Sequence, residues 1–113
     1  MKNVNGCIAD SFKSRNGGVF EFFIDKDFTA FQGHFPDNPV LPGIVQIEIA
    51  LFCVKNFLNK NDAVLKEVKK VKFVKPVLPD AAIAAVLTES GGFYNITIKN
   101  DKEIYSQISI AIS

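Results

Sequence analysis

The fold is decided by residues 32–48, QGHFPDNPVLPGIVQIE, where a proline-rich loop leads directly into a long apolar segment. Pro36, Pro39 and Pro42 each lack a backbone N–H and each disfavours the helical region for the residue before it. The loop is therefore stiff, and it holds His34, the only histidine of the chain, at a low cost in ordering entropy.

A helix is predicted from about Gly43 to Leu58, where the sequence NKND ends it. Pro42 suits the first turn of this helix because its missing N–H would have had no partner there. Apolar residues cover nearly the whole circumference of the segment. A helix that is apolar all round is expected to be enclosed by the protein.

Six further segments are predicted to be strands. Two precede the helix, at 6–14 and 18–25, and meet at Asn16-Gly17-Gly18, where Asn-Gly supplies the positive φ angles of a tight hairpin. Four follow it, at 66–75, about 81–89, 93–99 and 104–112. The alternation of isoleucine with polar or small residues in the last segment is the strongest strand signal.

This order of elements predicts one α+β domain over residues 1–113, in which an antiparallel six-stranded sheet wraps around one central helix. A small sheet of this kind has open edges, and such edges are often closed by a second copy, so we expect a dimer.

Composition excludes several classes of function. The net charge of +1 argues against nucleic-acid binding, and the apolar run at 43–58 is interrupted and too short to span a membrane. The first residues lack a secretory signal, so we expect a cytoplasmic protein in which Cys7 and Cys53 are reduced thiols. One histidine and two separated cysteines do not make a metal site, and no nucleotide-binding or G-x-S-x-G motif is present.

Glu48 is the first candidate for chemistry, because it lies within the apolar helix without a local cation. Residues three and four positions away on a helix are its neighbours, and here all four are apolar: Ile44, Val45, Leu51 and Phe52. Desolvation favours the neutral form of such a carboxyl group, which is the form a general acid requires. The alternative interpretation is that Glu48 points out through a gap in the apolar surface.

His34 is the second candidate. Gly33 and the Phe35-Pro36 pair would hold its imidazole against apolar surface, although a lone loop histidine is more often an ordinary surface or hydrogen-bonded residue. The helix that begins at Gly43 offers free N–H groups and a positive dipole end, which can polarise a carbonyl as an oxyanion hole does. A base, an acid and carbonyl-binding amides would then come from one short segment.

A lysine-rich segment follows the helix, with Lys66, Lys69, Lys70, Lys72 and Lys75. Such a run is most often a solvated strand face. The functional interpretation is a docking patch for an acidic partner, acting through encounter rate and orientation.

The segment GHFPDNPVLPG followed by Glu48 resembles the active-site segment of the 3-hydroxyacyl-[acyl-carrier-protein] dehydratases of the FabZ/FabA type. That family's pattern is roughly GHFPxxPxxPG with an acidic residue fourteen positions after the histidine, which His34 and Glu48 meet. KFVKPVLPD also resembles the family's RFKRPVxPGD segment, with Asp80 one place early. The resemblance implies a hot-dog fold, in which a sheet wraps a central helix.

The same resemblance implies the reaction and its residues. The implied reaction is the removal of water from a (3R)-3-hydroxyacyl thioester to give the trans-2-enoyl thioester. It would belong to fatty acid or related polyene biosynthesis and would need no cofactor. His34 and Glu48 would be catalytic, and the amide of Gly43 would bind the thioester carbonyl. In the family the histidine and the carboxylate of one site come from opposite subunits, which implies an obligatory homodimer, or a trimer of dimers.

The resemblance also implies acyl carrier protein as the partner, with Lys69, Lys70, Lys72 and Lys75 as its docking residues. After Glu48 the chain has IALF where the fatty-acid enzymes usually have AMAQ, and VQIE is closer to the VVQLD-like segment of aryl-polyene-type dehydratases. Two alternatives stay open: a hot-dog thioesterase, in which Glu48 activates water, and a non-catalytic subunit that binds acyl thioesters.

Overall fold

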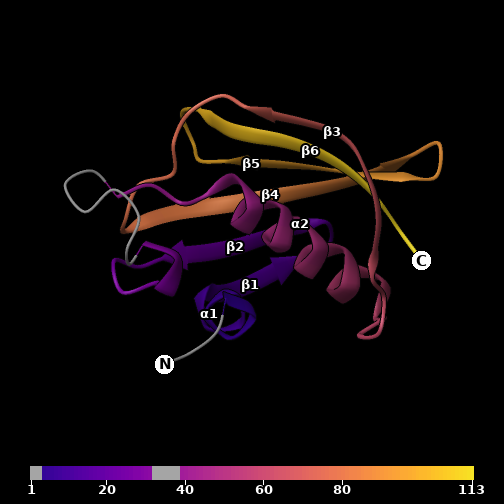
Figure 1. The fold of residues 1–113 in the computed structure, drawn as a ribbon, viewed down its shortest axis with the longest axis horizontal. Coiled ribbons are helices and arrows are strands. Elements are labelled where there is room, and N and C mark those ends of the chain that lie inside the picture. Colours follow the sequence, from indigo (N-terminus) through magenta and orange to yellow (C-terminus); the bar gives the residue numbers. More distant parts are fainter. Residues whose placement is uncertain (1–3, 32–38) are drawn as a thin grey trace.

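In the computed structural model, which describes residues 4–31 and 39–113, six strands of the described chain form one antiparallel sheet around a long helix (Figure 1). The strand order is β1-β2-β4-β5-β6-β3. This is the predicted α+β hot-dog arrangement. The elements in chain order are α1 Val4–Ser11, β1 Phe12–Asn16, β2 Val19–Ile24, the 3-10 helix η1 Thr29–Phe31, α2 Gly43–Leu58, β3 Leu65–Phe73, β4 Ala81–Ser90, β5 Phe93–Lys99 and β6 Ile104–Ile112.

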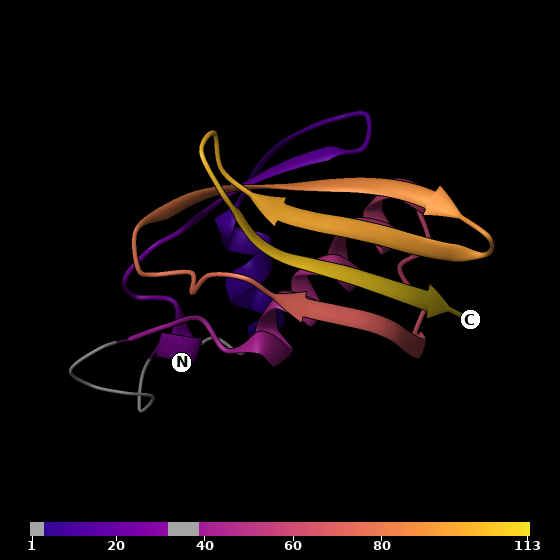
Figure 2. The same ribbon diagram turned by 90° about the horizontal axis from the view of Figure 1, so that it is seen from above.

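The core lies between α2 and the inner face of the sheet. Side chains alternate across a strand, so every second residue of β2, β4, β5 and β6 faces the helix. The inward-facing set from these strands is buried: Phe20, Phe22, Ile24, Ile83, Ala85, Leu87, Ile96, Ile98, Ile108 and Ile110. Figure 2 shows the same sheet from above, with β6 lying between β5 and the edge strand β3.

Helix α2 spans Gly43–Leu58, as predicted, although Pro42 is its N-cap rather than a residue of its first turn. One side of α2 is fully packed into the core, through Val45, Ile49, Ala50, Cys53 and Val54. The prediction that the helix is enclosed all round is wrong for the isolated chain. Ile44 is 64% exposed, because no element of the described chain covers the side of α2 that it occupies.

The carboxyl end of α2 is fixed by two features. Asn59 adopts the left-handed conformation at φ 54°, and the N–H of Lys60 donates to the Lys55 carbonyl at 2.9 Å, which closes the last turn. Arg15 of β1 lies over the rings of Phe20 and Phe57, 5.4 and 5.2 Å from their centroids. Its Nη1 also donates to the carbonyl of Asn56 at 3.2 Å, so the β1–β2 hairpin holds the end of the helix.

The predicted strand at 6–14 is wrong over 6–11, which belong to helix α1. Val4, Cys7, Ile8 and Ser11 recur at helical spacing and pack on the core, with Ile8 and Ser11 buried. The Ser11 hydroxyl donates to the Cys7 carbonyl one turn earlier. Helix α1 therefore buries one face against α2, β1 and β2.

The first hairpin turn differs in detail from the prediction. Its two central residues are Gly17 and Gly18, since Asn16 already pairs with Val19. Gly17 supplies the positive φ of 61°. Gly18 is required for another reason, because a Cβ there would lie 2.7 Å from the Leu87 carbonyl oxygen on β4.

Replacing Arg15 with alanine is expected to lower the free energy of unfolding by about 1–2 kcal/mol, since it removes two cation–π contacts and a hydrogen bond to the end of α2. Urea denaturation followed by far-UV circular dichroism measures this loss. Lys13→Ala, on the same strand but without these contacts, is the control, and an equal loss in that variant would contradict the assignment.

Candidate active site

Of the three residues predicted to be catalytic or to bind the carbonyl, two lie in the described chain. Glu48 and Gly43 are both on α2. His34 lies within 32–38, outside the described residues, so its role stays a prediction.

Glu48 is half-buried and lines a pocket of about 350 Å³ on the side of α2 that faces α1. Asn5 and Ile8 of α1 form one wall, and Leu51 and Phe52 of α2 form the apolar floor. The far end is polar, with Lys55, Asn56 and Asn61. Within the described chain Glu48 forms no hydrogen bond or ion pair, so its carboxyl group is available to a ligand or to another chain.

Phe52, in the floor of this pocket, belongs to an aromatic cluster. Its ring packs edge-on against Phe12 at 5.4 Å and Phe22 at 5.7 Å between centroids. Phe52 is one helical turn after Glu48 and ends the IALF sequence that stands where the fatty-acid enzymes usually have AMAQ. Sequence reasoning missed the wall from α1, although the helical spacing of Val4, Ile8 and Ser11 was the available signal.

Gly43 lines a different pocket, also of about 350 Å³, at the amino end of α2. Its other walls come from the loop before the helix, from α2 itself, and from the end of β3 with the segment after it. They consist of Val40, Leu41, Gln46, Phe73, Val74, Lys75 and Pro76. The first backbone donors used in α2 belong to Val45 and Gln46, which both bond to Pro42. Among the residues that the structure describes, the N–H groups of Gly43 and Ile44 have no acceptor, as expected at a helix start.

The ring of Phe73 lies directly on Gly43. A Cβ at position 43 would be 2.5 Å from Cζ of Phe73, so only glycine leaves room for the ring. Phe73 is the last residue of β3 and is 51% exposed. The helix start is thus covered by a half-exposed side chain.

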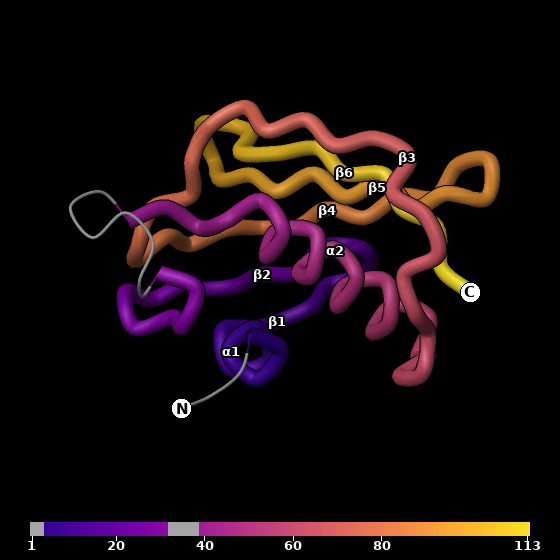
Figure 3. Tube along the Cα trace, viewed as in Figure 1, coloured from indigo at the N-terminus to yellow at the C-terminus, as the bar shows by residue number. Residues whose placement is uncertain are grey.

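The walls of the Gly43 pocket are held by contacts between distant segments. Figure 3 shows the segment after β3 running beside the loop that leads into α2, and the N–H of Leu41 donates to the Val77 carbonyl at 2.8 Å. The N–H groups of Val74 and Lys75 both bond to the carbonyl of Tyr105. These bonds fix the segment that forms one side of the pocket.

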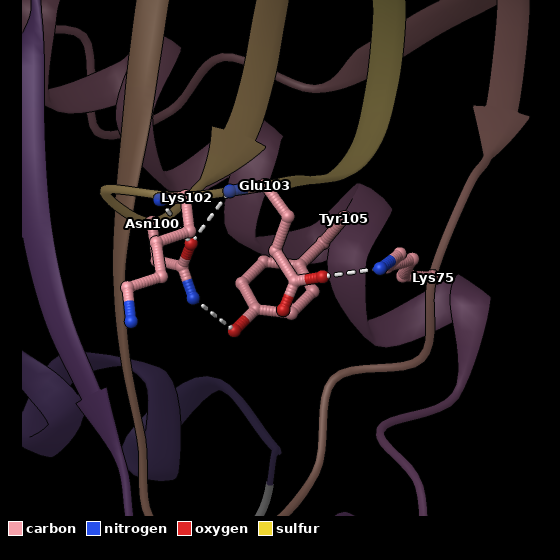
Figure 4. Close-up of polar contacts among 5 residues, drawn as sticks. All are labelled: Lys75, Asn100, Lys102, Glu103 and Tyr105. Atoms are coloured by element: carbon pink, nitrogen blue, oxygen red, sulfur yellow. Dashed lines mark hydrogen bonds and ion pairs between the residues drawn. The ribbon is translucent and has the colours of Figure 1, made fainter.

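The β5–β6 turn supports the same segment (Figure 4). The side-chain oxygen of Asn100 accepts the N–H groups of Lys102 and Glu103, both at 2.8 Å, and its amide donates to the Tyr105 hydroxyl at 2.9 Å. Glu103 then pairs with Lys75 at 2.6 Å. The hydrogen bond and the charge of Glu103 raise the pKa of Lys75, so this lysine stays cationic.

Gly43 and Glu48 of one chain do not form one site. They are five residues apart on α2, which turns their side-chain directions by roughly 140°. They accordingly line two pockets that share no residue. A site that used both groups would therefore need a second chain.

The lysine-rich segment presents fewer free cations than its sequence indicates. Pairing with β6 sets Lys70 opposite Ser109 and Lys72 opposite Gln107, whereas Val71 is opposite the buried Ile108. Partners in a ladder share a face, so Lys70 and Lys72 lie on the outer face of the sheet. Lys69 falls at an irregularity in the β3–β6 pairing and its Nζ lies 4.6 Å from the Phe93 ring centroid, while Lys75 is already paired with Glu103.

Other kinds of site are not formed by the described residues. Cys53 is buried, and this burial raises the pKa of its thiol, which disfavours the thiolate that a nucleophile requires. No three His, Cys, Asp or Glu side chains in 4–31 and 39–113 are grouped to hold a metal ion. None of the helices in these ranges is long and apolar enough to cross a membrane.

Comparison with known sequences points to dehydratases. The profile of the ApeI-like family, described as ApeI dehydratase, matches residues 11–108. A 3-hydroxyacyl-[acyl-carrier-protein] dehydratase FabZ from Rhodopseudomonas palustris is 36% identical over 70 residues, covering 55% of this chain and 46% of the relative. A second FabZ, from Desulfotalea psychrophila, is 44% identical over 57 residues, which are 43% of this chain and 38% of the relative. The matches thus span less than half the length of these relatives.

Solved structures share the fold. The dehydratase heterocomplex ApeI:P from Xenorhabdus doucetiae superposes with a TM-score of 0.73 at 22% identity, covering 89% of this chain and 92% of that one. A thioesterase from Staphylococcus aureus superposes with a TM-score of 0.58 at 18% identity, covering 91% and 92%. At these identities the likeness concerns the fold alone.

The contact between Gly43 and Phe73 predicts that Gly43→Ala has opposite effects on stability with and without the Phe73 ring. Gly43→Ala should destabilise the protein, because its Cβ displaces the Phe73 ring. In a Phe73→Ala background the same substitution should instead stabilise by about 0.5–1 kcal/mol, since alanine is the better helix former. Urea midpoints of the four proteins measure this double-mutant cycle. The same effect of Gly43→Ala in both backgrounds would show that the ring does not rest on Gly43.

Proposed function

Because the chain belongs to the ApeI-like dehydratase family, we propose that it removes water from a (3R)-3-hydroxyacyl group carried on acyl carrier protein. The product would be the trans-2-enoyl thioester, an intermediate of fatty acid or related polyene biosynthesis. We further propose that residues 1–113 act as one hot-dog domain in the cytoplasm and use no cofactor.

The observation that carries this proposal is the setting of Glu48. Its carboxyl group is half-buried above an apolar floor, and no cation or donor within the described chain engages it. A structural carboxylate is normally paired or hydrogen-bonded when it is withdrawn from water. A carboxyl group left free beside a pocket is what a proton donor to a substrate requires.

The proposed reaction assigns one task to each of three groups. His34 takes the proton from C2 of the acyl chain, while the N–H of Gly43 stabilises the negative charge that develops on the thioester oxygen. Glu48 gives its proton to the hydroxyl on C3, the C–O bond breaks, and water leaves. After water leaves, His34 carries the extra proton and Glu48 lacks one. His34 then releases its proton to solvent and Glu48 takes one up, which restores both residues.

We propose that a complete site contains Glu48 of one chain with His34 and Gly43 of another. The uncovered side of α2, which carries the exposed Ile44, and the exposed Phe73 at the end of edge strand β3 provide an apolar surface for a second subunit. We expect that subunit to be a second copy of this chain, with further assembly of dimers as an extension. The Xenorhabdus doucetiae relative is a heterocomplex, so a different hot-dog subunit is the alternative.

Acyl carrier protein is the proposed source of the substrate. Lys70 and Lys72 are exposed on the outer face of the sheet and would attract an acidic partner. Lys69 and Lys75 complete the predicted docking set, although Lys69 already contacts the Phe93 ring and Lys75 is already paired with Glu103.

His34→Ala and Glu48→Gln are each expected to lower kcat/KM for hydration of crotonyl thioester by about 100-fold or more, the usual contribution of a general acid or base. Loss of enoyl absorbance measures the reaction. If each site is shared, a mixture of the two inactive variants should recover up to about a quarter of the wild-type activity, because a symmetric mixed dimer has one intact site.

The controls for this experiment separate the alternatives. Light scattering of the wild-type protein should give twice the 12.5 kDa mass of one chain, or a larger multiple of it. Full activity in either variant would contradict the assignment of the residues. Release of free thiol from the thioester would instead identify a thioesterase, and tight binding without turnover would identify a non-catalytic subunit.

Lys72→Glu is expected to raise KM for carrier-bound substrate about fivefold, since an exposed ion pair contributes up to about 1 kcal/mol. KM for a small thioester without the carrier protein should be unchanged. Lys60→Glu makes the same change of charge at an exposed position before β3 and serves as the matched control. An equal rise in KM for both variants would show a general effect of charge and no docking site.

A further inference from the structure

Gln46 is a polar residue in the apolar side of α2. It is only 3% exposed, and its side-chain oxygen is buried without a hydrogen-bond partner in the described chain. A buried acceptor that loses its bonds to water lowers stability unless it gains another partner. An apolar residue of similar size would avoid this penalty, so packing alone does not explain a glutamine here.

The position of Gln46 relates it to the helix start. It follows Gly43 by one turn of α2, and both residues line the same pocket. Residues three apart on a helix lie on the same face, so the free N–H of Gly43 and the side chain of Gln46 are neighbours. The pocket thus combines a backbone donor for a carbonyl oxygen with a buried acceptor that lacks a donor.

A second buried group near this pocket also lacks a partner. The Ser106 hydroxyl on β6 is fully buried and forms no hydrogen bond in the described chain. Ser106 pairs directly with Phe73, so its side chain lies on the inner face beside the ring that covers Gly43. Both unpaired groups are therefore close to Phe73: Gln46 lines a pocket with it, and Ser106 is its cross-strand partner.

We propose that Gln46 binds the 3-hydroxyl group of the acyl substrate, by accepting its proton in a hydrogen bond while Gly43 holds the thioester oxygen. The inference rests on the proposed dehydration. A hydroxyl that receives a proton from Glu48 of another chain must still direct its own O–H to an acceptor, and the Gln46 oxygen supplies one. Departing water keeps that hydrogen bond, and Gln46 itself is chemically unchanged.

The walls of the pocket favour the acyl hydroxyl as the group that Gln46 binds, rather than an amide group of the carrier's pantetheine arm. Val40, Leu41, Phe73, Val74 and Pro76 are apolar and suit a hydrocarbon chain. Several amide groups of a pantetheine arm would need polar partners there. A single acceptor beside a carbonyl-binding donor matches a chain with one hydroxyl near its thioester.

Gln46→Met tests this inference, because methionine keeps the shape and removes the acceptor. Binding is measured by calorimetry in the Glu48→Gln background, where the substrate is not consumed, with 3-hydroxybutyryl and butyryl thioesters of N-acetylcysteamine. With Gln46 present the hydroxylated ligand should bind about tenfold more tightly, the value of one net hydrogen bond. In the Gln46→Met variant this preference should be lost while affinity for the butyryl ligand is unchanged. Gln107→Met, at an exposed position of β6, should keep the preference.

Stability gives a second readout that does not depend on turnover. Gln46→Met should raise the urea midpoint, since it removes an unpaired buried acceptor, and it should lower kcat/KM for the hydroxylated substrate. Equal weakening of both ligands would assign Gln46 to the amide of the thioester arm and overturn the proposal. A lower midpoint, or a loss of dimer without a change in ligand preference, would show a structural role instead. If the protein binds with this preference but does not dehydrate, the proposed function fails and Gln46 remains a hydroxyl-binding residue.

Discussion

The structure depends on the burial of one side of α2 against the inner face of the sheet. Val45, Ile49, Cys53 and Val54 are almost completely withdrawn from water, and the strands opposite contribute a continuous layer of isoleucine and phenylalanine. Apolar burial is the dominant favourable term in folding, and here a single helix supplies one whole side of the contact. The position of every candidate site residue on α2 follows from this packing.

The two ends of α2 are treated differently. Its carboxyl end is closed by the left-handed Asn59 and held by Arg15. At its amino end, N–H groups without an acceptor in the described chain lie beneath a half-exposed phenylalanine. Within the described chain, polar groups without partners lie near this open end, at Gln46, and in the pocket beside α1, at Glu48. Stable proteins satisfy most such groups internally, and this is the reason for proposing that this part of the fold contacts ligands or other chains.

Local patterns predicted α2 within the bounds observed and the last four strands within one or two residues, since helical and alternating periods are carried by neighbouring residues. A strand is predicted where helix α1 forms, because the helical face at 4–11 is short and is stabilised by contacts with α2 that no local pattern records. Gly43 and Glu48 are candidates from the sequence alone. Their separation into two pockets follows from packing against α1 and against the end of β3, which the sequence does not reveal. The roles proposed for Phe73 and Gln46 depend on contacts across the fold, and the β3–β6 pairing decides that Lys70 and Lys72 share the outer face of the sheet.

The support beneath the Gly43 pocket has a spectroscopic consequence. The chain contains no tryptophan and two tyrosines, so its ultraviolet emission comes from Tyr94 and Tyr105 alone. Tyr105 is buried, its hydroxyl is bonded to Asn100, and its carbonyl holds the segment that walls the pocket. Intrinsic fluorescence of the unlabelled protein therefore reads out the state of that wall, and replacing Tyr94 with phenylalanine would reduce the signal to this single reporter.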